Sequence, residues 1–150
     1  MTLTTHIPYF AYGANMVPRQ MAERCPTARI AGTARLPGYR FIIATCGYAS
    51  IVPATDTDDA LVHGILWHVT AADVVALDLF EEVGTALYFK SEASVITATG
   101  VACQAMVYMA RDPNEGVPAA EYLPEIIDTA SQFGFPNTYV EMMRGWVERK

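Results

Sequence analysis

Short apolar runs separated by turn-forming residues fill most of the chain, a pattern that predicts many short strands and few helices. The aromatic run at residues 9–12 predicts a first strand, and Gly13 begins the turn after it. Pro37-Gly38 and residues 56–59 are typical turns between later strands. The other strand-like runs lie at 28–36, 39–45, 49–53, 61–69, 86–97 and 101–109.

The clearest helix signal begins at Thr70, which is a good N-cap residue. Asp73 stands three residues later, where the acid of a capping box is found, so a helix is expected over residues 71–80. One face of this helix carries the apolar residues Val74, Leu77 and Phe80. Further helices are predicted at 16–25, 119–133 and 137–147.

This order of elements favours the α+β class. Consecutive strands joined by short turns pair mostly antiparallel, and closure of so many strands into a barrel would remove exposed sheet edges. The predicted fold is a small, mostly antiparallel (mixed) β-barrel flanked by a few helices. A length of 150 residues suits one domain over residues 1–150 with one core.

Composition and charge narrow the classes of partner. The net charge is −6 and the basic residues are scattered, so nucleic-acid binding is not expected. No apolar run approaches the roughly 18 residues of a membrane span, and the first eight residues lack the regions of a signal peptide. Three widely spaced cysteines argue against a disulfide framework, so a cytoplasmic location is expected.

The histidines do not predict a metal site. His63 and His68 lie five residues apart on one predicted strand, so their side chains should point to opposite faces of the sheet. Without converging ligands a shared metal is not expected. The glycine patterns of nucleotide-binding loops are also absent from the sequence.

A first candidate site is the turn Tyr12-Gly13-Ala14-Asn15, which joins a predicted strand to a predicted helix. Gly13 can adopt backbone angles closed to other residues, and the small Ala14 lets a ligand approach the main chain. Unpaired N–H groups near a helix N-terminus can hold a carboxylate without a basic side chain. The same residues also fit an ordinary strand-to-helix turn with Asn15 as cap.

A second candidate site is the acidic cluster of Asp78, Glu81 and Glu82 at the end of an apolar helix. A carboxyl group against apolar surface has a raised pKa because its charged form loses hydration. Such a pKa suits proton transfer near neutral pH. The alternative is a solvated acidic helix end, although acids are unfavourable at a helix C-terminus.

Taken in order along the chain, several short segments resemble the γ-glutamylcyclotransferase family and its AIG2-like relatives. Residues 9–15 resemble the opening strand and the Y-G-S-N turn of that family, and residues 77–81 with Tyr88 resemble its L-D-x-x-E segment and trailing tyrosine. Similar matches lie at 34–41, 49–53, 62–67, Tyr122 and 134–139. The resemblance spans nearly the whole chain and implies a γ-glutamylcyclotransferase-like fold.

The resemblance also implies roles for residues. It places Glu81, rather than Glu82 or Asp78, at the position of the catalytic carboxylate. It implies that the segment from Tyr9 to Asn15 cradles a γ-glutamyl group, largely through main-chain groups. The implied substrate contacts are Tyr9, Phe10, Ala11, Tyr12, Gly13, Ala14, Asn15, Tyr88 and Tyr122.

Two positions depart from the family pattern. Ala14 replaces the usual serine, so an altered substrate preference is expected before a loss of activity. Glu82 stands where many relatives have glycine, and its charge could raise the pKa of Glu81 if the two carboxylates lie close.

The implied reaction is intramolecular attack of the α-amine of a γ-glutamyl compound on its γ-carbonyl, which releases 5-oxoproline and a free amine. Glu81 would be the general acid/base, and no cofactor or metal is expected. The alternative is a non-catalytic binder of γ-glutamyl or amino-acid ligands on the same fold. Neither the leaving amine nor the oligomeric state follows from the sequence.

Overall fold

A computed structural model describes residues 6–54 and 60–149 of the chain. Its strands are β1 (Ile7–Ala11), β2 (Arg29–Pro37), β3 (Tyr39–Ile43), β4 (Ala49–Pro53), β5 (Leu61–Val69), β6 (Tyr88–Thr97) and β7 (Ala102–Ala110). Its helices are η1 (Ala14–Met16), α1 (Pro18–Arg24), α2 (Ala71–Phe80), η2 (Val83–Thr85), α3 (Leu123–Gln132) and α4 (Asn137–Val147). Here η marks a short 3₁₀ helix.

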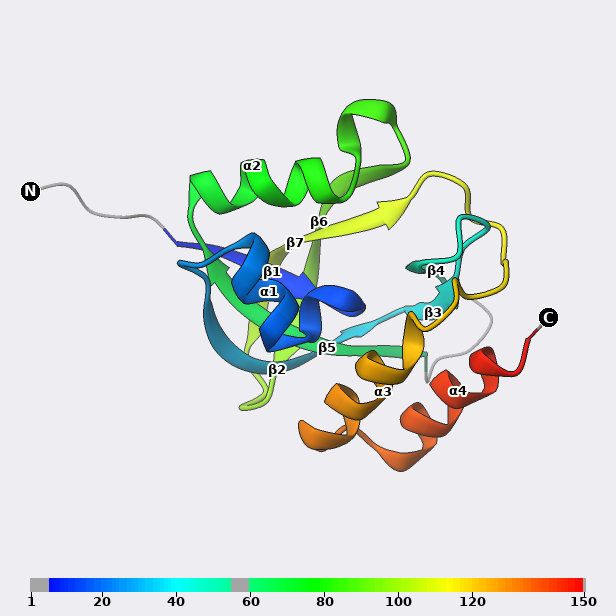
Figure 1. Cartoon of the computed structure of the whole chain (residues 1–150). Coiled ribbons are helices and arrows are strands. Elements are labelled where there is room, and N and C mark those ends of the chain that lie inside the picture. Colours follow the sequence, from blue (N-terminus) through cyan, green and yellow to red (C-terminus); the bar gives the residue numbers. More distant parts are fainter. Residues whose placement is uncertain (1–5, 55–59, 150) are drawn as a thin grey trace, which may run out of the picture.

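Five strands close into a barrel in the order β1-β5-β2-β6-β7 (Figure 1). All pairs within it are antiparallel except β1 with β7, which meet in parallel at Tyr9 and Met106 and complete the ring. A separate antiparallel pair, β3 and β4, packs beside the barrel against β5 and β7. The predicted mixed, mostly antiparallel barrel with a few helices is therefore confirmed.

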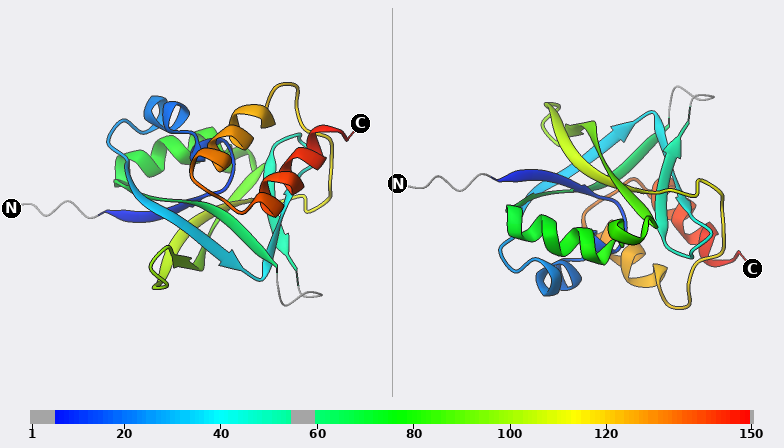
Figure 2. Two further views of the ribbon diagram at one scale, coloured as in Figure 1. Left: turned by 90° about the horizontal axis from the view of Figure 1, so that it is seen from below. Right: turned by 90° about the horizontal axis from the view of Figure 1, so that it is seen from above.

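Helices α1, α2 and α3 lie on the same side of the barrel (Figure 2). Helix α1 contacts α2, and α3 contacts both α4 and η1. The buried core inside includes Phe10, Met16, Ile65 and Leu77, each with no exposed surface. As a result, the C-terminal end of α2 and the N-terminal end of α3 both approach the turn after β1.

The capping residues Thr70 and Asp73 correctly predicted where α2 begins. The Thr70 hydroxyl accepts from the Asp73 N–H at 3.2 Å, and the Asp73 carboxylate accepts from the Thr70 N–H at 3.0 Å, so the predicted capping box is confirmed. Leu77 is fully buried, whereas Phe80 is 42% exposed. Phe80 is thus the exposed end of the predicted apolar face, and its ring centroid lies 3.6 Å from the Arg24 guanidinium carbon.

Other boundaries differ from the predictions because single residues adopt angles that the sequence does not reveal. Val17 has extended angles before Pro18, so the predicted helix over 16–25 is divided into η1 and α1. Ala86 has a φ of 63°, and β6 begins only at Tyr88. Helix α3 begins at Leu123 after Glu121 at a φ of 61°. The predicted turn at 56–59 lies outside the described residues.

Candidate active site

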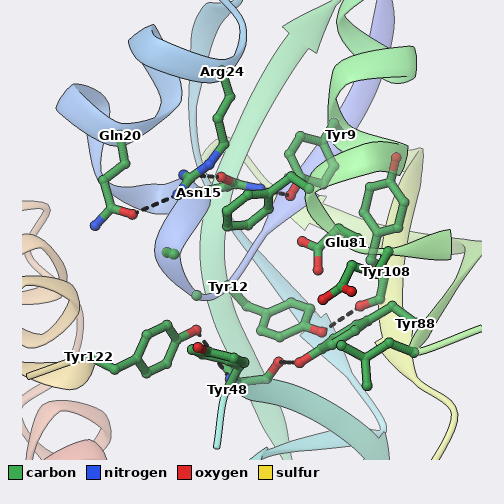
Figure 3. Close-up of a pocket in the computed structure, with 16 residues that line it drawn as sticks. Tyr9, Tyr12, Asn15, Gln20, Arg24, Tyr48, Glu81, Tyr88, Tyr108 and Tyr122 are labelled. Carbon is green, nitrogen blue, oxygen red and sulfur yellow. Dashed lines mark hydrogen bonds between the residues drawn. The ribbon is translucent and has the colours of Figure 1, made fainter. Parts of the chain in front are cut away.

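A pocket of about 360 Å³ lies where the turn after β1 meets the end of α2, which is a size typical of small-molecule sites (Figure 3). Its walls come from elements far apart in the sequence: β1, α1, the start of β4, the end of α2 and β7. The residues that line it are Tyr9, Tyr12, Gly13, Ala14, Asn15, Gln20, Arg24, Tyr48, Ala49, Phe80, Glu81, Glu82, Leu87, Tyr88, Tyr108 and Tyr122.

Gly13 lines the pocket at a point where a side chain would be tightly crowded. A Cβ atom at this position would lie 3.0 Å from the Ala49 Cβ and 3.1 Å from the Tyr122 Oη. The Tyr122 hydroxyl accepts from the Ala49 N–H at 3.1 Å, which fixes the tyrosine against the turn. This crowding is with protein atoms, so the approach of a ligand to the main chain at Ala14 stays a prediction.

Asn15 is a buried hydrogen-bonding centre and not a helix cap. Its side chain is 3% exposed and makes no capping bond, so the alternative in which Asn15 merely caps a turn is wrong. The Arg24 guanidinium donates to Asn15 Oδ1 at 2.7 Å, and Asn15 Nδ2 donates to the Tyr9 hydroxyl at 3.0 Å. The Trp67 indole N–H donates to the Asn15 carbonyl at 3.0 Å and anchors the turn to β5.

Glu81 is the residue directly after α2, and its side chain is directed into the pocket among tyrosines (Figure 3). Burial raises the pKa of the Glu81 carboxyl from its ordinary value of 4.5 to about 7, while the Arg24 guanidinium acts in the lowering direction. The solvated acidic helix end considered above does not describe this residue. A carboxyl group with a pKa near 7 can both accept and return a proton at neutral pH.

Glu82 does not act on Glu81 in the way considered above. The raised pKa of Glu81 comes from burial, and the Glu82 carboxylate is not among its causes. The Glu82 side chain is exposed, and its backbone has a φ of 52° and a ψ of 45°. This left-handed conformation favours glycine, which gives a physical reason for a glycine at this position in other chains.

Replacing Glu82 with glycine should therefore stabilise the protein. Relief of the left-handed conformation outweighs the extra chain entropy of glycine, so we expect the free energy of unfolding to rise by about 0.5–1 kcal/mol. Urea denaturation would measure the change. Glu92→Gly is a suitable control because Glu92 is exposed within β6, where glycine should lower stability by about 0.5–1 kcal/mol. A loss of stability in Glu82→Gly would contradict the expectation.

Two predicted site residues do not reach the pocket. Phe10 is fully buried and Ala11 is 2% exposed, and neither lines the cavity. Neighbouring side chains on a strand point to opposite faces, so Tyr9 faces the pocket while Phe10 packs in the core close to Gly64. The other predicted residues do come together: Tyr9, Tyr12, Gly13, Ala14, Asn15, Glu81, Tyr88 and Tyr122 all line the pocket.

Sequence reasoning missed several pocket residues, and Arg24 is the most consequential. It is the only basic side chain among the described residues that line the pocket. Its guanidinium also donates to Gln20 Oε1 at 3.0 Å, which holds it at the edge of the cavity. A spacing of nine residues from Asn15 carries no periodic signal that would have linked the two. The other missed residues are Gln20, Tyr48, Ala49, Phe80, Leu87 and Tyr108.

The described residues offer no centre for a metal. No three His, Cys, Asp or Glu side chains within 6–54 and 60–149 gather closely enough to hold an ion. His63 packs on Tyr139 and Phe135, whereas His68 lies near His6, so the two histidines face different surroundings as predicted. Across the same residues, no helix is long and apolar enough to cross a membrane.

The fold and the site place the chain in a class of small closed mixed barrels that hold a partly buried carboxylate and several tyrosines in one pocket. Residues 61–143, more than half of the chain, match the model of the AIG2-like family, and the chain belongs to that family. This agrees with the resemblance in the sequence.

Two mammalian proteins named γ-glutamylcyclotransferase are similar to this chain. The chain is 25% identical over 146 residues to γ-glutamylcyclotransferase of Mus musculus and equally to that of Homo sapiens, covering 91% of this chain and 76% of each relative. A solved structure described as a γ-glutamyl cyclotransferase superposes with a TM-score of 0.84 at 23% identity, covering 94% of this chain and 88% of that one. The fold is thus that of the γ-glutamyl cyclotransferases.

Proposed function

We propose that the protein is a γ-glutamylcyclotransferase-type enzyme that cyclises the γ-glutamyl part of a small molecule to 5-oxoproline. The observation that carries the proposal is the Glu81 carboxyl, with a pKa of about 7, facing the Gly13 turn across one pocket. The names of the relatives support the same reaction class.

The chemistry needs one proton carrier. Ionised Glu81 takes a proton from the α-ammonium group of the substrate, because an ammonium has no lone pair with which to attack. The freed amine forms a C–N bond to the γ-carbon, and the carbonyl electron pair moves to oxygen. When this intermediate collapses, the bond to the leaving nitrogen breaks, and Glu81 returns its proton to that nitrogen. The ring nitrogen still carries one proton too many, and Glu81 passes it to the released amine, which leaves as an ammonium ion. The enzyme mainly holds the substrate folded for this ring closure.

The Gly13 side of the pocket is proposed to hold the α-carboxylate. Main-chain N–H groups at this turn can donate to an anion that approaches closely. The Tyr122 hydroxyl lies against the same turn and could donate to the same carboxylate. Tyr88 donates to the Ala49 carbonyl at 2.7 Å. Its side chain would form the part of the pocket wall between Glu81 and the Gly13 turn.

Substituting valine for Gly13 should weaken substrate binding. Its branched side chain would collide with Ala49 and Tyr122 and occupy the space proposed for the carboxylate. We expect KM to rise by at least about tenfold, equivalent to about 1.4 kcal/mol. Gly145→Val serves as the control, because Gly145 is exposed on α4 and a Cβ there meets nothing within 4 Å. An unchanged KM in folded Gly13→Val would show that the carboxylate binds elsewhere.

A panel of donors tests the proposed function directly. Purified protein would be incubated with γ-glutamyl-amino acids, γ-glutamylamines and glutathione, and 5-oxoproline would be detected by mass spectrometry. Release of 5-oxoproline from at least one donor is expected, and the best donor would identify the leaving amine. Saturable binding of these compounds without product would contradict the proposal and favour a non-catalytic binder of the same ligands.

A further inference from the structure

The hydroxyl protons of the pocket tyrosines are not equally available to a ligand. Tyr12 donates to the Tyr108 carbonyl, Tyr88 donates to the Ala49 carbonyl, and Tyr108 donates to Asp78 Oδ1 at 2.6 Å. Each of these three hydroxyl protons is already held by a fixed acceptor of the protein. A hydroxyl has only one proton to donate, so none of them is free to donate into the pocket.

Tyr9 differs because its oxygen accepts a hydrogen bond. Arg24 carries only donors, so the Asn15 atom that faces Arg24 must be the carbonyl Oδ1. The amide Nδ2 of Asn15 must then face Tyr9, to which it donates at 3.0 Å. The orientation of this amide is thus fixed by chemistry, and the Tyr9 proton is left to point elsewhere.

The position of Tyr9 directs that proton toward the reacting centre. Tyr9 is 3% exposed and lines the pocket on the same side as Glu81, whereas Tyr122 lies on the opposite side (Figure 3). Burial and the nearby Glu81 carboxyl hold the pKa of Tyr9 well above its usual range, so its hydroxyl stays protonated. Arg24 and Asn15 draw electron density from the phenol oxygen, which makes the hydroxyl a better donor.

We propose that the Tyr9 hydroxyl donates a hydrogen bond to the γ-carbonyl oxygen of the substrate as negative charge develops there, and that Asn15 and Arg24 are its positioning residues. This assignment rests on the proposed cyclisation. Glu81 must reach both the attacking and the leaving nitrogen, and both are bonded to the γ-carbon in the intermediate. A donor beside Glu81 therefore lies next to the oxygen of that carbon. The Tyr9 proton stays on Tyr9 throughout, so Glu81 remains the only proton carrier.

The decisive experiment separates kcat from KM. Tyr9→Phe removes one oxygen atom, and loss of an oxyanion donor typically lowers kcat by about 10²- to 10³-fold. We expect that loss with KM changed by less than about threefold, since the interaction strengthens only in the transition state. Tyr139→Phe is the matched control, because Tyr139 is a buried tyrosine outside the pocket whose hydroxyl donates to the His63 carbonyl. Thermal unfolding of each variant would verify that it is folded.

A second variant tests the direction of the hydrogen bond. Asn15→Asp is nearly isosteric and keeps the contact with Arg24, but its second oxygen accepts, so the Tyr9 hydroxyl would turn away from the pocket toward residue 15. We expect kcat to fall as in Tyr9→Phe, with no further loss when the two changes are combined. A purely structural role for Asn15 would instead make the two losses add.

The outcomes are distinguishable from failure of the proposed function. Wild-type turnover together with a normal kcat in Tyr9→Phe would overturn the Tyr9 assignment and leave the cyclisation intact. A normal kcat in Asn15→Asp would overturn the roles of Asn15 and Arg24. Absence of 5-oxoproline from the wild type with every donor would overturn both proposals.

Discussion

Glu81→Gln should lower kcat by about 10²- to 10⁴-fold, the range over which a positioned acid/base group accelerates proton transfer. Glutamine matches the size of glutamate but cannot take the proton of the α-ammonium group or return it to the leaving amine. KM should change little, because the proposed carboxylate contacts at the Gly13 turn are untouched. Steady-state release of 5-oxoproline would measure both constants.

The pH dependence of kcat in the wild type is a second test of the proposed role of Glu81. The carboxyl must be ionised to accept a proton, and its pKa is about 7, so kcat should rise as pH increases through about 7. Glu82→Gln is the informative comparison, because it removes the adjacent carboxylate and should retain far more turnover than Glu81→Gln. Near-normal turnover in folded Glu81→Gln, or an equal loss in both variants, would contradict the assignment of Glu81.

The sequence predicted those features that depend on neighbours along the chain. The capping box at Thr70 and Asp73 fixes where α2 begins, and the length of its apolar run fixes where it ends. Glu81 follows directly and therefore lies at the end of this helix. The buried side chain of Leu77 packs the helix against the barrel. The short turn between β6 and β7 predicted their antiparallel pairing, whereas β5 pairs with β1 and β2 across long stretches of chain.

The features that the sequence missed depend on contacts between distant segments. Arg24 enters the site only because α1 packs against α2, and Tyr108 enters through β7, which pairs with β1 on closure of the barrel. Phe10 was assigned to the site with its neighbours, yet strand alternation turns it into the core. The local angles at Glu82 and Ala86, which set where η2 begins and ends, also have no signature in these residue types.

The raised pKa of Glu81 predicts that this carboxylate, proposed above as the proton carrier, destabilises the fold above neutral pH. The folded protein holds this carboxyl at a pKa of about 7, against an ordinary value of 4.5 in the unfolded chain. Between these pH values the folded state binds more protons at Glu81 than the unfolded state does. The contribution of protonated Glu81 to the free energy of unfolding is therefore fully present below about pH 4.5 and is lost as pH rises through 7. A shift of this size corresponds to about 3 kcal/mol.

Glu81→Gln should therefore be more stable than the wild type by about 3 kcal/mol at pH 8 and nearly equal to it at pH 4.5. Glutamine does not ionise, so the variant escapes the cost of burying a charge while it loses turnover, as expected where function requires a strained site. Urea denaturation at the two pH values would measure the difference, and groups that titrate identically in both proteins cancel in the comparison. If the two proteins had the same stability at pH 8, Glu81 would be well hydrated in the folded state, and its proposed proton transfer near neutral pH would lose its physical basis.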